Sequence, residues 1–377
     1  MIEARATGSL GTVSRDQGRY EEARAQTERQ LALAREIGDR RGEARAATSL
    51  GTVFWSQGRY EEARAQHERA LTLSREIGDR RGEAGATGNL GNVFLRQGPY
   101  EEARAQYEKC LALSREIGHR HSEAFSTGNL GLIFSIQGRY EEARAQFEKH
   151  LALSREIGDR QYEAIALVNL GPLQANFGQT DLARETLNES LRVLREIGAR
   201  RPEGHALEGL GSVAEQRGEA EEARRFYEES LALRREMSDS SGVASTLVSL
   251  GRLDTSQGEE QAAISRLDEA LALAKEMEEP DSILLATVSR SLLPGADKET
   301  ALAAFEEHEE RAANSTKMDA RFRLWELTQD RTHLEEAHRL LTLMRDHAPE
   351  DWRDSMIENV PLHRDIMRVW EERAGSG

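Results

Sequence analysis

Glycine-rich stretches are the first features of this sequence that could do chemistry. Residues 88–98 read GNLGNVFLRQG, and glycines so closely spaced are typical of loops whose backbone N–H groups hold a phosphate. Such a loop follows a strand and opens a helix, and no strand pattern precedes Gly88. The same frame ends again at Gly58, Gly138 and Gly178. A phosphate site has no reason to recur at constant spacing, so these glycines indicate a structural repeat.

Histidines could instead bind a metal or act as acid–base groups. The motif HEERA at His308 is close to the zinc motif H-E-x-x-H, but Ala312 stands where the second ligand belongs. Four others fall at a repeat junction or at helix-packing positions and are expected to be loop or packing residues: His67, His119, His121 and His150. The sequence therefore predicts no metal site.

No other catalytic constellation stands out. Cys110 is the only cysteine, which excludes an internal disulfide and a cysteine-based zinc cluster and fits a reducing compartment. Carboxylates are plentiful, but they lie in helix first turns and in Glu–Arg pairs, which are solvated faces by default. No G-x-S-x-G elbow, Walker lysine or cysteine–histidine pair is present. We therefore expect no enzyme, no catalytic residue and no cofactor.

A forty-residue repeat organises most of the chain. The pair Leu-Gly returns seven times without insertion, from Leu10-Gly11 to Leu250-Gly251. Each copy is expected to bury its apolar face on the next. The predicted repeats are residues 1–38, 39–78, 79–118, 119–158, 159–198, 199–238 and 239–278. Residues 279–377 lose the register and are expected to form degenerate helical hairpins that cap the array.

Each repeat reads as two antiparallel helices. In the second repeat Ala47, Leu50 and Phe54 fall on one helical face, and Gly51 lets the partner helix approach closely. Gly58 is expected to end the first helix, because glycine takes the left-handed conformation at little cost. Repeats one to four are nearly identical, whereas departures such as GQTDLARET in repeat five grow toward the C-terminus. Duplication copies residues without selecting them, so near-identity alone does not mark a binding surface.

The repeat pattern resembles the tetratricopeptide repeat. In the third repeat the matching residues are Leu90, Gly91, Phe94, Ala103, Tyr107 and Cys110. The usual period is about 34 residues, and the longer unit here is similar to the repeats of Pins-type spindle-orientation adaptors and kinesin light chains. It is also similar to the repeat blocks of large bacterial signalling proteins. The resemblance covers residues 1–277 and implies an all-α, right-handed α-solenoid with a helical C-terminal cap.

The resemblance also implies a binding groove. In tetratricopeptide arrays the first helix of each hairpin lines the concave face, and in Pins-like and peptide-pheromone-binding proteins of this kind that face holds a peptide. Asn89, Asn129 and Asn169 could hold an extended peptide backbone, since an amide donates and accepts hydrogen bonds. Alternatively, they are solvated or bond within the array. The predicted groove residues are Arg45, Ser49, Thr52, Trp55, Asn89, Asn92, Arg96, Asn129, Leu132, Ile136, Asn169, Asn176, Ser212 and Gln216.

Charge and hydropathy restrict the class of partner. The net charge of −16 argues against a sequence-independent nucleic-acid binder, whose affinity comes from neutralising phosphates. No apolar run is long enough for a membrane span, and the N-terminus is already in repeat register, which leaves no room for a signal peptide. These observations favour a cytoplasmic protein without nucleic-acid or membrane partners.

Three functions remain compatible with these patterns. The leading hypothesis is a non-enzymatic scaffold that grips a peptide or helix of a protein partner in the groove. The alternative is the sensor or regulatory part of a bacterial signalling protein, in which ligand binding to the repeats controls a kinase, cyclase or ATPase module. Self-association through the C-terminal helices is a further possibility.

Overall fold

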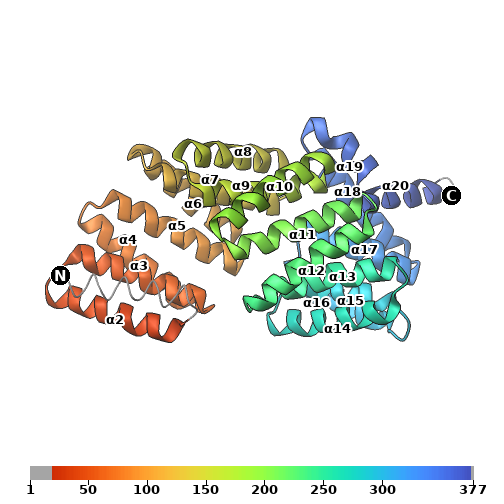
Figure 1. Cartoon of the computed structure of the whole chain (residues 1–377), viewed down its shortest axis with the longest axis horizontal. Helices are drawn as coiled ribbons and strands as arrows, with labels where there is room; N and C mark the ends of the chain where they lie inside the picture. The colour runs from red at the N-terminus through yellow and green to blue at the C-terminus, as the bar shows by residue number, and fades with distance from the viewer. Residues whose placement is uncertain (1–18, 375–377) are drawn as a thin grey trace. The chain divides into compact units, whose positions relative to one another are not determined.

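The computed structural model describes residues 19–374, and this part of the chain is all-α (Figure 1). It contains nineteen α-helices and two short 3₁₀ helices and no strand. The all-α prediction is therefore confirmed. The first helix expected for repeat one lies outside the described residues.

Paired helices recur at the predicted forty-residue spacing. Each first helix begins forty residues after the preceding one, and each second helix starts a few residues after the first one ends. The repeat helices are α2 (Tyr20–Glu36), α3 (Arg40–Ser56), α4 (Tyr60–Glu76), α5 (Arg80–Gln97), α6 (Tyr100–Glu116), α7 (Arg120–Ile136), α8 (Tyr140–Ile157), α9 (Arg160–Asn176), α10 (Thr180–Ile197), α11 (Arg200–Gln216), α12 (Ala220–Glu236), α13 (Ser240–Ser256) and α14 (Glu260–Glu276).

The C-terminal region continues as shorter and less regular helices. The first of them begins at Pro280, still forty residues after Ser240, and the register is lost only after it. These helices are α15 (Pro280–Ser291), α16 (Lys298–His308), η1 (Glu309–Arg311), α17 (Asn314–Thr328), α18 (Arg331–Asp346), η2 (Glu350–Trp352), α19 (Arg353–Asn359) and α20 (Pro361–Ala374).

Local chemistry fixes the helix ends. The Asp39 carboxylate accepts a hydrogen bond from the backbone N–H of Gly42 at 2.9 Å and thereby caps the first turn of α3. The turn between α3 and α4 passes through Gly58 at a φ of 73°, a left-handed conformation that glycine adopts without strain. A glycine with a positive φ stands at the same place in repeats two to seven, so this feature of the hairpin recurs with the sequence repeat.

The second recurring glycine sets how closely the helices of a hairpin pack. A Cβ atom placed on Gly91 of α5 would lie 2.7 Å from Cε1 of Tyr107 on α6. Tyr107 is fully buried, and its hydroxyl donates to Oδ1 of Asn92 at 2.7 Å. The glycine therefore makes room for a ring that fills the space between the two helices, as the sequence predicted.

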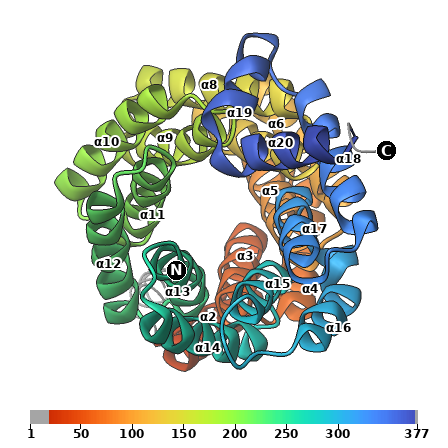
Figure 2. The same cartoon turned by 90° about the vertical axis from the view of Figure 1, so that its right-hand side faces the viewer.

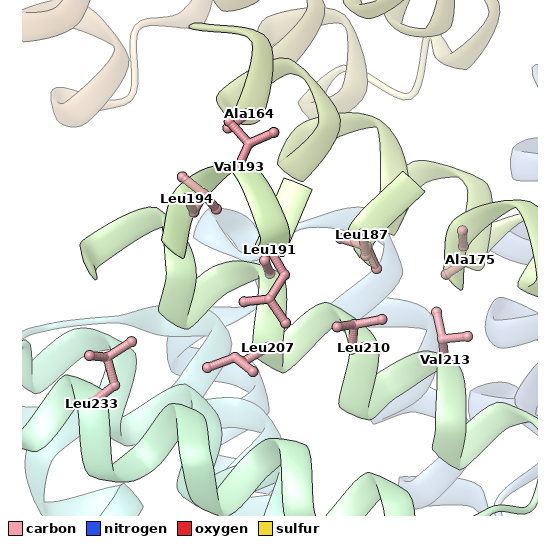
Figure 3. Close-up of a cluster of buried hydrophobic side chains, with 12 residues drawn as sticks. Ala164, Ala175, Leu187, Leu191, Val193, Leu194, Leu207, Leu210, Val213 and Leu233 are labelled. Carbon is pink, nitrogen blue, oxygen red and sulfur yellow. The ribbon is translucent and has the colours of Figure 1, made fainter. Parts of the chain in front are cut away.

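The described chain divides into two compact units. The first comprises residues up to Ile133 together with Ala152–Gly158, and the second comprises Phe134–Leu151 and the chain from Asp159 onward. In the second unit a continuous apolar cluster lies along α9, α10, α11 and α12. Figure 3 shows Leu187, Leu191, Leu207 and Leu210 at its centre. Burial of such side chains stabilises the array by roughly 1.5–3 kcal/mol each.

The expectation that the carboxylates form only solvated faces was wrong for one repeated position. Glu43, Glu83, Glu123 and Glu163 are all buried at the start of a first helix. Glu83 accepts hydrogen bonds from Arg75 at 2.8 Å and Arg80 at 2.9 Å. The bond from Arg75 outweighs burial and, with Arg80, holds the pKa of Glu83 below its usual value. Glu43, Glu83 and Glu123 each join a first helix to the helix before it, through Arg35, Arg75 and Arg115.

Candidate functional site

The predicted groove residues lie on the first helices of the hairpins, and none of them is fully buried. Nine belong to the first unit: Arg45, Ser49, Thr52, Trp55, Asn89, Asn92, Arg96, Asn129 and Leu132. Five belong to the second: Ile136, Asn169, Asn176, Ser212 and Gln216. The surface that the repeat register selects is therefore available to solvent in both units.

Part of this surface is engaged in hydrogen bonds within the array. Asn92 accepts from Tyr107, Asn129 donates to the Phe125 carbonyl at 2.9 Å, and Thr52 donates to the Thr48 carbonyl at 3.0 Å. By contrast, the side chains of Asn89, Asn169 and Asn176 make no hydrogen bond to any other described residue. Asn129 therefore bonds within the array, whereas the amides of Asn89 and Asn169 are left to solvent or to a ligand, which is compatible with both readings of the predicted ladder.

A cavity of about 530 Å³ lies within the second unit. Three of the predicted residues, Asn176, Ser212 and Gln216, line it together, beside Glu215 and Arg252. Its volume falls inside the range of roughly 300–1,000 Å³ that is usual for ligand sites. The first helices α9, α11 and α13 thus bring their solvent-facing polar residues into one hollow.

The opposite wall comes from the C-terminal helices. Ser315, Thr316 and Asp319 of α17 line the cavity, as do Leu362 and His363 at the start of α20. Sequence reasoning missed these residues because they follow the last repeat, where no spacing relates them to the groove. Only contacts between distant parts of the chain bring them to the cavity.

An ion cluster ties this wall to the repeats. Asp319, which is buried, accepts from Arg252 of α13 at 2.7 Å and from Arg323 of α17 at 3.2 Å. Burial alone would raise the pKa of Asp319, but the two guanidinium groups outweigh it and lower that pKa. The carboxylate therefore stays charged and holds Arg252 in one orientation at the cavity.

Two further groups shape the cavity without carrying charge. The hydroxyl of buried Tyr227 donates to Oε2 of Glu215 at 2.9 Å, and burial raises the pKa of Tyr227 well above its usual value. His363 lies with Nδ1 3.0 Å from the Met356 carbonyl, and burial lowers its pKa to about 4. Both side chains are therefore neutral at physiological pH, and they shape the cavity by packing and hydrogen bonding.

Residues 19–374 contain neither a cluster of metal-binding side chains nor a helix that could span a membrane. No group of three or more His, Cys, Asp or Glu side chains there is arranged to hold a metal ion. Within the same range, no helix is both long enough and apolar enough to span a membrane. His67 and His150 are buried against neighbouring helices, as expected for packing residues, and burial lowers the pKa of each to about 4.

The repeat geometry agrees with the comparison to known families. The tetratricopeptide repeat model matches residues 3–76, 82–156, 127–196 and 202–276, which is well over half of the sequence. The chain belongs to the tetratricopeptide repeat family. No curated protein matches it closely enough to count as a relative.

Several solved structures share this fold at low sequence identity. A Rap protein complexed with the competence and sporulation factor is 12% identical, covers 100% of this chain and 99% of its own, and has a TM-score of 0.64. The Rap conjugation gene regulator of plasmid pLS20, in complex with the Phr* peptide, is 13% identical over 91% of this chain and 96% of its own, with a TM-score of 0.64. A putative kinesin light chain of Podosopora anserina with nearly identical TPR-like repeats is 16% identical. It covers 51% of this chain and 95% of its own, with a TM-score of 0.41.

Proposed function

We infer that this protein is a non-enzymatic binding protein that holds an extended peptide in the cavity of its second unit. The observation that carries this proposal is the lining of the cavity. Asn176, Ser212 and Ser249 offer donors and acceptors of hydrogen bonds, and Arg252 offers a guanidinium that Asp319 already holds in place. These groups match the alternating N–H and C=O groups of a peptide backbone.

The pre-ordering of these groups supports binding over simple solvation. Arg252 loses little further rotational freedom when a ligand arrives, because the buried Asp319 already fixes it. The side chains stand on helices, which hold them more precisely than a loop would. The cavity also has an apolar component from Leu253, Met318 and Leu362, which could receive an aliphatic side chain of the ligand.

The regulatory alternative gains support from the fold comparison. Both Rap structures named above were determined with a peptide or factor bound, and one of these proteins is described as a conjugation gene regulator. A peptide is therefore the ligand class that the likeness favours for this chain as well. A role as the sensor of a signalling system follows if the bound peptide is a signal instead of a segment of a larger partner.

Selection from a random peptide library displayed on phage tests the proposal without a known ligand. The full chain is immobilised, bound peptides are enriched, and one selected peptide is synthesised with a photoreactive phenylalanine analogue. We expect the cross-links, mapped by mass spectrometry, to fall on cavity residues such as Asn176, Ser212 and Ser249. Failure to enrich any peptide, or cross-links confined to helices that do not line the cavity, would contradict the proposal.

A further inference from the structure

The C-terminal segment Pro349–Asn359 docks on a turn of the repeat array that lies about 180 residues earlier in the sequence. We call this segment the clasp and the turn Phe177–Gln179 its seat. The Asn359 amide donates to the Gly178 carbonyl at 2.9 Å, and the Ser355 hydroxyl lies 2.8 Å from the Phe177 carbonyl. The seat connects α9 to α10, and Figure 2 shows α19 close to α9.

An aromatic contact and an ion pair complete this interface. Trp352 of the clasp is buried, and the centroid of its ring lies 6.1 Å from the centroid of the Phe177 ring. The guanidinium carbon of Arg144 lies 4.3 Å from the centroid of the same indole ring. Arg144 also pairs with Asp351 at 2.8 Å. The clasp is therefore held by one buried aromatic side chain, by hydrogen bonds to the backbone of the seat and by one partly exposed ion pair.

The seat fits the clasp closely enough to require glycine. A Cβ atom on Gly178 would overlap the carbonyl oxygen of Ser355. At the same repeat position, Gly58, Gly98 and Gly258 have open space where a Cβ would lie. All four glycines have a positive φ, so the backbone requirement is shared and only the contact with the clasp is particular to Gly178.

The sequence of the seat departs from the repeat in the same place. Gln57 and Gln97, at the position of Phe177, donate to Glu21 at 2.9 Å and Glu61 at 2.7 Å, thirty-six residues earlier in each case. Phe177 gives up this regular contact between repeats. Its ring instead packs 4.8 Å from Tyr140 and receives Trp352 on another side. The departure from the repeat thus coincides with the surface that the clasp covers.

The clasp is connected directly to a wall of the cavity. It ends at Asn359, and the next residues, Val360, Pro361, Leu362 and His363, line the cavity. His363 contacts the Met356 carbonyl within the clasp at 3.0 Å. Movement of the clasp off its seat would therefore displace this wall.

We propose that the clasp opens and closes on its seat and thereby controls entry to and exit from the cavity. The clasp is short, its large buried side chains are Trp352 and Met356, and its ion pair is partly exposed. Such an interface belongs to the less stable part of a structure, where local opening occurs without global unfolding. Because the wall of the cavity moves with the clasp, a ligand that contacts Leu362 or Val360 stabilises the closed form. By linkage, closure of the clasp then strengthens binding of that ligand. This last step rests on the proposed function, whereas opening and closing do not.

Thiol labelling measures the opening directly. In a Cys110→Ala background, which removes the only native thiol and restores the alanine found at position 70, Ser212→Cys places a single thiol in the cavity. Gly178→Ala is then added to displace the clasp, and Gly258→Ala is the control for alanine at positive φ. The probe is a bulky aromatic disulfide. We expect Gly178→Ala to accelerate labelling of Cys at position 212 by roughly tenfold or more and Gly258→Ala to leave it within about twofold.

A thiol in the first unit and a variant without added bulk serve as controls for a general loss of stability. Thr52→Cys occupies the same repeat position in the first unit and does not line the cavity, so its labelling rate should be unaffected by Gly178→Ala. The pair Ser355→Ala with Asn359→Ala removes clasp hydrogen bonds without adding bulk and should accelerate labelling in the same direction. Hydrogen exchange of residues 349–370 should rise in parallel. Equal labelling rates in the Gly178→Ala and Gly258→Ala proteins would overturn the proposal.

These experiments use no peptide, so their outcome is independent of the phage selection. Accelerated labelling with no peptide enriched would support the clasp and contradict the proposed function. Enriched peptides with an unchanged labelling rate would support the proposed function and contradict the movement of the clasp. If both succeed, the selected peptide should slow labelling of the Ser212→Cys protein and lower the exchange of the clasp.

Discussion

The turn after α5 and the turn after α9 occupy the same place in their repeats, but they have different surroundings. Gly98 ends α5 in open space, and Gln97 beside it bonds the previous repeat. Gly178 after α9 lies against Ser355, and Phe177 beside it is buried under aromatic rings. Phe177 and Gln179 replace Gln97 and Pro99 of repeat three, and both contact the C-terminal segment that docks here. Specialisation in this protein is therefore found where the repeat is least regular.

Exchange of the two side chains gives the largest expected effect. Phe177→Gln restores the residue of the earlier repeats but removes a buried ring from contact with Tyr140 and Trp352. We expect a loss of about 3–5 kcal/mol in the free energy of unfolding, measured by urea denaturation. The reverse change, Gln97→Phe, lies on an exposed position and should alter stability by less than about 0.5 kcal/mol. Similar losses for both variants would remove the distinction between the two turns.

A second difference separates the last repeat from the first ones. Asp254 is fully buried between Arg224 at 2.6 Å and Arg266 at 2.8 Å, at the position that holds Phe54 in repeat two. Asp254→Ala leaves two cations without their shared carboxylate and should cost about 3 kcal/mol in urea denaturation. Glu68→Ala, which removes the exposed partner of Arg64, should cost below about 0.5 kcal/mol. A cost for Asp254→Ala as small as that of Glu68→Ala would contradict this interpretation.

The histidine of repeat two makes stability depend on pH. Burial lowers the pKa of His67 to about 4, below its value of about 6.5 in the unfolded chain. Protonation of His67 therefore favours the unfolded state. The stability that the neutral imidazole contributes is complete above pH 6.5 and is lost as the pH falls to 4. His67→Phe, which copies Phe147 of repeat four, should reduce the loss of stability between pH 7 and pH 5 by about 2 kcal/mol. An unchanged pH profile would show that His67 does not titrate as described.

The smallest effect should be the same in both units. Arg80 joins Glu83 to Glu116 at 2.9 Å, and Arg160 joins Glu163 to Glu196 in the same way. Each arginine is about half exposed, so Arg80→Ala and Arg160→Ala should each lower the free energy of unfolding only slightly in urea denaturation, and by less in high salt. A much larger cost for only one of them would reveal a difference between the units that the contacts do not show.

Most of the fold follows from periodicity. Leu50, Gly51 and Phe54 are buried where the repeat predicted, and Gly58 has the positive φ expected of a helix-ending glycine. This burial could be predicted from nearby sequence, because each residue packs within its own hairpin or against the next one. The C-terminal helices were predicted as a cap, but nothing in their spacing indicated that Ser355 or Asn359 would contact repeat five.

The candidate site was predictable only on one wall. Asn176, Ser212 and Gln216 could be selected from the repeat register, since that register determines which face of a first helix is exposed. Asp319 and His363 could not, because their place in the cavity depends on contacts between distant segments. The departures at Phe177 and Gln179 were visible in the sequence, yet their cause became clear only with Trp352 beside them.

Binding of a selected peptide to two matched variants tests most directly that the second unit contains the binding site. Asn176→Ala with Gln216→Ala truncates one repeat position at the cavity, and Ser56→Ala with Arg96→Ala truncates the same position in repeats two and three. By calorimetry, we expect the cavity variant to weaken binding at least tenfold, or about 1.4 kcal/mol, and the other variant to stay within about twofold of wild type. A loss confined to the Ser56→Ala, Arg96→Ala protein would place the peptide on the first unit and contradict the proposal.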